Sequence, residues 1–184
     1  MVLKNNFKNC KVSFLSVICA LLFVIIAVII RICTGNPYRI INYCDIKNVI
    51  PPIWVMTVMW LFWYIMLGIA FGSIFSREKN NNNENKYKCG MLFITMMALG
   101  YAWYPMFFGK GALFLALLIC EVVLLLSIFC FICFWRINLC YASIMCMFSI
   151  WMIWMVILNI IVFLNCWILN LIVCFCINML DKCV

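Results

Sequence analysis

The chain has 184 residues, of which 70% are hydrophobic and 10% are charged, and its formal net charge is +8 at pH 7. A soluble domain is about half apolar and a quarter charged. After folding, a domain of this length still exposes to water about a third of the surface that its unfolded chain exposes. The composition therefore excludes an ordinary soluble enzyme, a disordered chain and a nucleic-acid-binding module. We expect most of the chain to lie in lipid.

The basic residues are dispersed between long apolar stretches and form no single patch of the kind that binds nucleic acid. This distribution is typical of a multi-pass membrane protein, whose Lys and Arg residues lie in the loops. With five spans, eight basic residues fall on the side of the N-terminus and five on the other side. The positive-inside rule then favours a cytoplasmic N-terminus, and the plasma membrane of a bacterium is the expected location.

Fourteen cysteines and the absence of histidine bear on metal and redox chemistry. Most of the cysteines lie inside apolar stretches, where a free thiol behaves as a small hydrophobic side chain. Cys130 and Cys133 have the CxxC spacing, but they fall within an expected span, away from basic groups that would activate a thiol. We therefore expect packing cysteines, with no metal site. The lack of histidine excludes the usual zinc sites and histidine-ligated haem.

Five spans are expected from the uncharged stretches, because about 20 apolar residues cross a bilayer core of about 30 Å. The first has a basic flank like a signal peptide, but its apolar stretch is too long and no small-residue cleavage pattern follows. The second opens at Pro51-Pro52, and proline suits a first helical turn because its missing N–H would have no partner there. The expected spans are residues 12–32, 52–75, 90–108, 112–135 and 141–164.

The last uncharged stretch runs from Ile137 to Leu180. As one helix its 44 residues would extend about 66 Å, more than twice the thickness of the bilayer core. We therefore expect one span followed by an apolar tail over residues 165–184, or a hairpin of two spans. The prediction is an all-α protein, a single integral membrane domain over residues 1–184 with five transmembrane helices. Six helices are the alternative.

The second expected span carries two large aromatic residues and two glycines on one helical face. Trp60, Tyr64, Gly68 and Gly72 follow one another at steps of four, and residues four apart are neighbours on a helix. A Gly-x-x-x-Gly pair lets another helix approach closely, within one bundle or in a homodimer, and the aromatic end of the face is suited to lining a cavity. The spacing alone leaves packing and a cavity both open.

Four motifs, in order, resemble those of one known family. They are PPIWV at 51–55 with Trp60, Tyr64 and Gly68; LGYAWYPMFFG at 99–109; FWR at 134–136; and Trp151 followed by Leu-Asn at 158–159 and 164–165. Over roughly residues 38–165 the chain resembles the TspO/MBR family, the tryptophan-rich sensory proteins, which includes the mitochondrial translocator protein. The resemblance implies five transmembrane helices around a pocket that is closed by the loop after the first helix.

The resemblance also implies a ligand, because members of this family bind porphyrins. We therefore expect a membrane receptor or sensor that binds porphyrin (protoporphyrin) or a similar flat hydrophobic ligand, contacts membrane lipid and requires no cofactor. A homodimer is a candidate assembly. Arg39 and Lys47, in the loop over the pocket, are candidates for pairing with the porphyrin carboxylates, and simple topogenic charge explains them equally well. The candidate pocket residues are Trp54, Trp60, Tyr64, Tyr101, Trp103, Phe107, Trp151 and Asn159.

Two alternative functions remain open. Some bacterial members of the family are credited with light- and oxygen-dependent breakdown of protoporphyrin by two tryptophans, whose motif positions match Trp54 and Trp151. Small-molecule transport is the second alternative, although transport usually needs more polar groups along the path than these spans contain. Conventional catalysis is excluded, because the membrane region has no acid–base pair or nucleophile constellation.

The chain departs from the family pattern at several positions. Gly100 stands where asparagine is usual, and Met155 stands where a small residue usually lines the pocket, so we expect a narrower or differently shaped pocket. Ile119 stands at the position where the family has an acidic residue, and Glu121 lies two residues further along. Two residues correspond to a rotation of about 200° around a helix. Glu121 should therefore face elsewhere. No sterol-recognition pattern follows residues 158–159, which argues mildly against sterol binding.

Overall fold

The computed structural model describes residues 12–44, 46, 49–76 and 83–180, and this part of the chain contains helices and no strand. Five of the helices are long and apolar enough to cross a membrane, which confirms the predicted all-α, five-span fold. The elements are α2 (Phe14–Thr34), α3 (Tyr38–Tyr43), α4 (Ile53–Phe75), α5 (Asn83–Tyr104), the short π-helix η2 (Pro105–Gly109), α6 (Leu113–Ile137) and α7 (Leu139–Leu180).

Local sequence signals set the ends of the first span. Before α2, the Ser13 hydroxyl accepts a hydrogen bond from the N–H of Leu15 and the Ser16 hydroxyl accepts one from the N–H of Ser13, a capping box. After α2, Gly35 has a φ of +84°, a backbone conformation that glycine adopts without strain. The chain can therefore turn sharply into α3.

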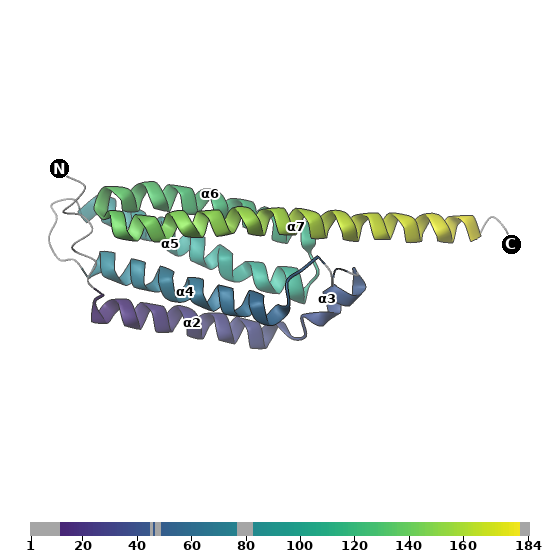
Figure 1. The fold of residues 1–184 in the computed structure, drawn as a ribbon, viewed down its shortest axis with the longest axis horizontal. Coiled ribbons are helices and arrows are strands. Elements are labelled where there is room, and N and C mark those ends of the chain that lie inside the picture. Colours follow the sequence, from purple (N-terminus) through teal and green to yellow (C-terminus); the bar gives the residue numbers. More distant parts are fainter. Residues whose placement is uncertain (1–11, 45, 47–48, 77–82, 181–184) are drawn as a thin grey trace.

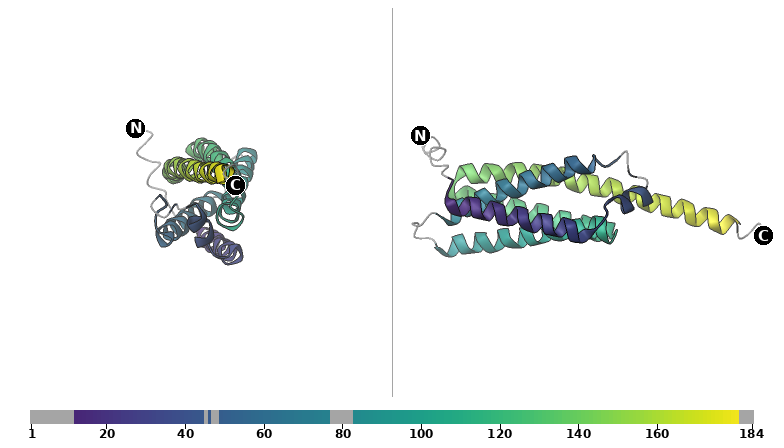
Figure 2. Two further views of the ribbon diagram at one scale, coloured as in Figure 1. Left: turned by 90° about the vertical axis from the view of Figure 1, so that its right-hand side faces the viewer. Right: turned by 90° about the horizontal axis from the view of Figure 1, so that it is seen from below.

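The helices form two closely packed groups (Figure 1). The helix α2 packs along α4, while α5 packs on α6 and α6 packs on α7. Between the groups, α4 contacts α5 and α7 over much less of its length. The end-on view also separates α2 and α4 from α6 and α7 (Figure 2, left). The interface between these two groups is the place where the bundle is least tightly joined.

The Gly-x-x-x-Gly pair of α4 packs against α2 of the same chain. A Cβ atom added to Gly68 would lie 2.4 Å from the Cα of Ala20, and one added to Gly72 would lie 2.4 Å from the Cα of Ser16. In the same contact the hydroxyls of Ser16 and Ser73 share a hydrogen bond of 2.7 Å. The two backbones therefore touch, and the glycine pair serves packing within one bundle.

The last helix continues beyond the bundle. The 42 residues of α7 form one uninterrupted helix, Leu139–Leu180, whose C-terminal part extends past the other helices (Figures 1 and 2). The hairpin of two spans that the sequence left open is therefore wrong. The expected tail, residues 165–184, continues the same helix as far as Leu180, and residues 181–184 lie outside the described part of the chain.

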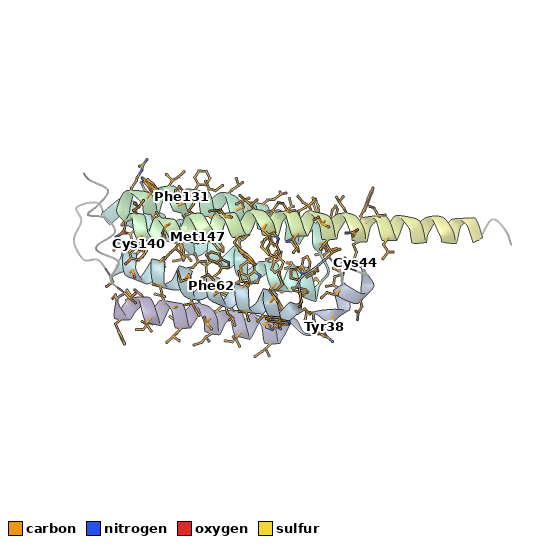
Figure 3. The ribbon with its side chains drawn as sticks, in the orientation of Figure 1. Tyr38, Cys44, Phe62, Phe131, Cys140 and Met147 are labelled. Carbon is orange, nitrogen blue, oxygen red and sulfur yellow. A yellow bond between two sulfur atoms is a disulfide. The ribbon has the colours of Figure 1, made fainter. Side chains whose placement is uncertain are left out.

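Three cysteines in the described part of the chain are disulfide-bonded, which corrects the expectation of packing cysteines for these positions. Cys44, just after α3, is bonded to Cys166 of α7, with their Cα atoms 4.9 Å apart. Cys140 is also disulfide-bonded and lies at the opposite end of the bundle from Cys44 (Figure 3). Cys44 and Cys166 are separated by 122 residues in the sequence, so only the fold brings them together. Their disulfide ties the segment after α2 to the point where α7 leaves the bundle.

Replacing Gly72 by alanine should destabilise the bundle, because the new Cβ would overlap the backbone of α2 at Ser16. We expect a loss of about 1–3 kcal/mol, the usual effect of overpacking, measured as a lower melting temperature of the purified protein in detergent. Gly100→Ala is the matched control, because a Cβ there meets no atom within 4 Å. Equal melting temperatures for the two variants would contradict the close contact of α2 and α4.

Candidate functional site

A narrow cavity lies between α2, α4 and α5, at the end of the bundle that carries α3. The free space within it is about 80 Å³, less than the roughly 300–1,000 Å³ of typical ligand pockets. Its walls are apolar apart from a few groups. The charged, hydroxyl-bearing and indole side chains of the lining are Arg31 from α2, Thr57, Trp60 and Tyr64 from α4, and Tyr101, Trp103 and Tyr104 from α5.

Five of the predicted pocket residues form a continuous series of ring contacts, which we call the ring column. Tyr101 stacks on Tyr64 with ring centroids 5.0 Å apart, and Tyr64 stacks on Trp60 at 5.8 Å. Trp60 contacts Trp103 at 5.7 Å, and Trp103 stacks on Phe107 at 5.1 Å. Each such pair contributes about 0.5–1.5 kcal/mol beyond the burial of its surface. The ring column therefore crosses the interface between α4 and α5 and narrows the cavity.

Hydrogen bonds fix the orientation of two of these rings. The Nε1–H of Trp103 donates to Oδ1 of Asn159 at 3.1 Å, and the Asn159 amide donates in turn to the carbonyl of Met155 at 2.8 Å. The hydroxyl of Tyr101 donates to the carbonyl of Phe23 on α2 at 2.9 Å. Asn159 is buried and does not line the cavity. Its contribution is to position the Trp103 indole from the far side.

The structure does not bring the two tryptophans of the family motif together. Trp151 lies behind the cavity wall, where its ring contacts Trp60 edge-on with centroids 6.4 Å apart and also contacts Trp63. Trp54, in the first turn of α4, is 70% exposed and makes no ring contact within the described part of the chain. Neither residue lines the cavity. Trp54 is the one predicted pocket residue whose side chain is exposed.

Arg31 is a cavity residue that the sequence interpretation missed. Its guanidinium donates to the hydroxyl of Thr57 and lies over the ring of Tyr104, 5.9 Å from the ring centroid, within the range of cation–π contacts. The sequence interpretation selected Arg39 and Lys47 instead, and Lys47 and the Arg39 side chain lie outside the described part of the chain.

A signal for Arg31 was present in the sequence. The residues of α2 that contact α4 at its glycines, Ser16 and Ala20, are small. Ala27 continues this small-residue face, because it is seven residues after Ala20, close to two helical turns. Arg31 follows Ala27 by four residues and therefore extends the same face of α2 into the cavity.

Four hydrogen-bond donors in this part of the bundle have no acceptor, and two of them, Trp60 and Tyr104, belong to residues that line the cavity. All four are buried and unpartnered in the described part of the chain: the Nε1–H groups of Trp60, Trp63 and Trp151 and the hydroxyl of Tyr104. A buried donor without a partner costs about 1–3 kcal/mol. Such a concentration of unpaired donors in an apolar setting is a feature of the site that stability alone does not explain.

The residues that depart from the family pattern do not line the cavity either. Gly100 has open space beside its Cα, and Met155 is fully buried with its carbonyl bonded to Asn159. Glu121 is exposed on α6 and does not line the cavity. These substitutions therefore do not set the width of this cavity.

A comparison with protein-family models places this geometry in context. The model of the TspO/MBR family matches residues 17–165. The match ends one residue before Cys166, so that it includes every residue lining the cavity and omits the extension of α7. No curated protein and no solved structure matches the chain.

Replacing Asn159 by alanine should loosen the site, because the buried N–H of Trp103 then loses its acceptor. We expect a loss of about 1–3 kcal/mol, together with a changed near-ultraviolet circular dichroism signal from the freed indole. Asn165→Ala is the control, because Asn165 is exposed and its amide donates to the Ile161 carbonyl of its own helix. A circular dichroism spectrum identical to wild type for Asn159→Ala would show that this contact does not hold Trp103.

Proposed function

The chain belongs to the TspO/MBR family and is a multi-pass membrane protein, and from this premise we propose that it is a membrane receptor or sensor that binds porphyrins between α2, α4 and α5. The observation that carries the proposal is the ring column, in which aromatic side chains of α4 and α5 meet at the cavity. Porphyrin acts here as the ligand, and no resident cofactor is required.

The chemistry of the cavity suits a flat, largely apolar ligand that also carries acceptor atoms. Indole and phenol faces stack favourably on other aromatic surfaces. The unpaired donors of Trp60 and Tyr104, both in lining residues, would gain partners from carboxylate oxygens at the edge of a porphyrin. A ligand of this kind replaces ring–ring stacking by ring–ligand stacking, so the enthalpy of the stacked contacts is kept.

Binding of a porphyrin must widen the cavity. Free space of about 80 Å³ holds a few water molecules but not a tetrapyrrole. The sparse contacts of α4 with α5 mark the interface that can open, and opening there separates the two packed groups of helices. This movement gives the receptor a way to report its ligand to a partner, because the same helices form the outer surface of the bundle.

The orientation in the membrane is part of the proposal. The excess of basic residues on the N-terminal side, eight against five, supports a cytoplasmic N-terminus in a bacterial plasma membrane. The cavity end of the bundle, with α3, then faces away from the cytoplasm, because α2 crosses the membrane once before reaching it.

Titration of the purified protein with protoporphyrin IX should quench tryptophan fluorescence, and Trp60→Leu should weaken binding about tenfold. The reason is that this substitution removes a stacking partner worth about 1 kcal/mol or more. Trp54→Leu is the matched control on the same helix, because Trp54 is 70% exposed and outside the cavity. Unchanged affinity in Trp60→Leu, or equal losses in both variants, would contradict binding in this cavity.

A further inference from the structure

Arg31 is the only charged side chain that lines the cavity in the described part of the chain. It lies in the last turn of α2, within the first span. A cation near the end of a span usually extends outward to the lipid headgroups. Here the guanidinium instead contacts Thr57 of α4 and the Tyr104 ring of α5. The protein therefore keeps a half-buried positive charge at the cavity, whose lining is mostly apolar.

In the part of the chain that the structure describes, the charge of Arg31 has no anionic partner. A guanidinium has five N–H donors, and in the described part of the chain only one hydrogen bond is made, to the neutral hydroxyl of Thr57. That hydroxyl donates to the carbonyl of Ile53 at 2.8 Å, so its oxygen is left to accept from Arg31. No described carboxylate pairs with this guanidinium. Unpaired charge in an apolar site is costly, and a compensating anion would be correspondingly stabilising.

We propose that Arg31 is the anion-binding residue of the cavity and that the ligand is a flat, hydrophobic molecule with a carboxylate at its edge. This inference rests on the proposed porphyrin-binding function and defines which porphyrins are bound. The contacts with Thr57 and Tyr104 hold the guanidinium between α4 and α5, so that its remaining N–H groups are available to a carboxylate. Arginine binds carboxylates through two parallel hydrogen bonds, which fixes the orientation of the ligand.

The proposal predicts that the cavity distinguishes a free acid from its ester. Charge-assisted hydrogen bonds are stronger than neutral ones, so losing them should reduce affinity by about tenfold to a hundredfold. A dimethyl ester keeps the ring and its stacking but loses the negative charge. Arg31 therefore acts as a specificity residue, whereas the ring column contributes equally to binding of the acid and of the ester.

The test is a titration of the full chain, in nanodiscs of neutral phosphatidylcholine, with protoporphyrin IX and with its dimethyl ester. Wild type, Arg31→Gln and Arg31→Lys are compared, with Arg136→Gln as the charge-matched control because Arg136 is exposed at the end of α6 and outside the cavity. We expect wild type to bind the acid at least tenfold more tightly than the ester. In Arg31→Gln the affinity for the acid should fall to that for the ester, while the affinity for the ester should be unchanged. Arg31→Lys should retain part of the preference for the acid.

The outcomes separate this inference from the function on which it rests. If wild type binds neither compound, the porphyrin function itself is wrong. If wild type binds both equally, or if Arg31→Gln keeps the preference for the acid, the role of Arg31 is overturned while porphyrin binding stands. If Arg31→Gln binds neither compound because it fails to fold, the ratio of acid to ester affinity in wild type and in Arg31→Lys decides, and equal ratios in the two proteins overturn the role of Arg31.

Discussion

The backbone contact between α2 and α4 is the constraint on which the cavity depends. At Gly68 and Gly72 the two helices touch, and no side chain larger than hydrogen fits between them. One face of α4 carries these glycines and, one and two turns earlier, Tyr64 and Trp60, which line the cavity. The same face therefore brings α4 onto α2 at one end and holds a cavity at the other. The two interpretations that the spacing left open are both true, at different ends of one helix.

At the cavity end of α4, aromatic side chains make the interhelical contacts that the glycines make at its other end. The ring column joins α4 to α5 across the interface between the two packed groups, where backbone contacts are sparse. Side chains that stack can separate and stack again on something else, whereas interlocked backbones at glycines cannot move apart without losing the contact entirely. The bundle is thus joined by backbone contacts between α2 and α4 and by side-chain stacking between α4 and α5. The cavity is bounded by both kinds of contact.

The sequence was sufficient for whatever depends on local spacing. The five spans follow from apolar stretches, and the face from Trp60 to Gly72 follows from steps of four. Features that depend on the pairing of distant segments were not accessible. Nothing near Cys44 indicates a bond to a residue 122 positions away, and the continuity of α7 conflicts with a rule based on membrane thickness. Arg31 was missed because a basic residue at the end of a span looks like ordinary topogenic charge, although its spacing from Ala20 and Ala27 places it on the small-residue face of α2.

The energetic balance of the site explains why a binding function is more consistent with it than a purely structural one. Each stacked pair in the ring column gains about 0.5–1.5 kcal/mol, but each buried donor without a partner costs about 1–3 kcal/mol, and two such donors, Trp60 and Tyr104, belong to residues that line the cavity. Arg31, which has no anionic partner among the described residues, adds a further electrostatic cost. A core selected for stability alone would hold apolar side chains in these places. A ligand with an aromatic face and acidic edges would keep the stacking and remove these costs, so the groups that destabilise the empty bundle are the ones that would stabilise the complex.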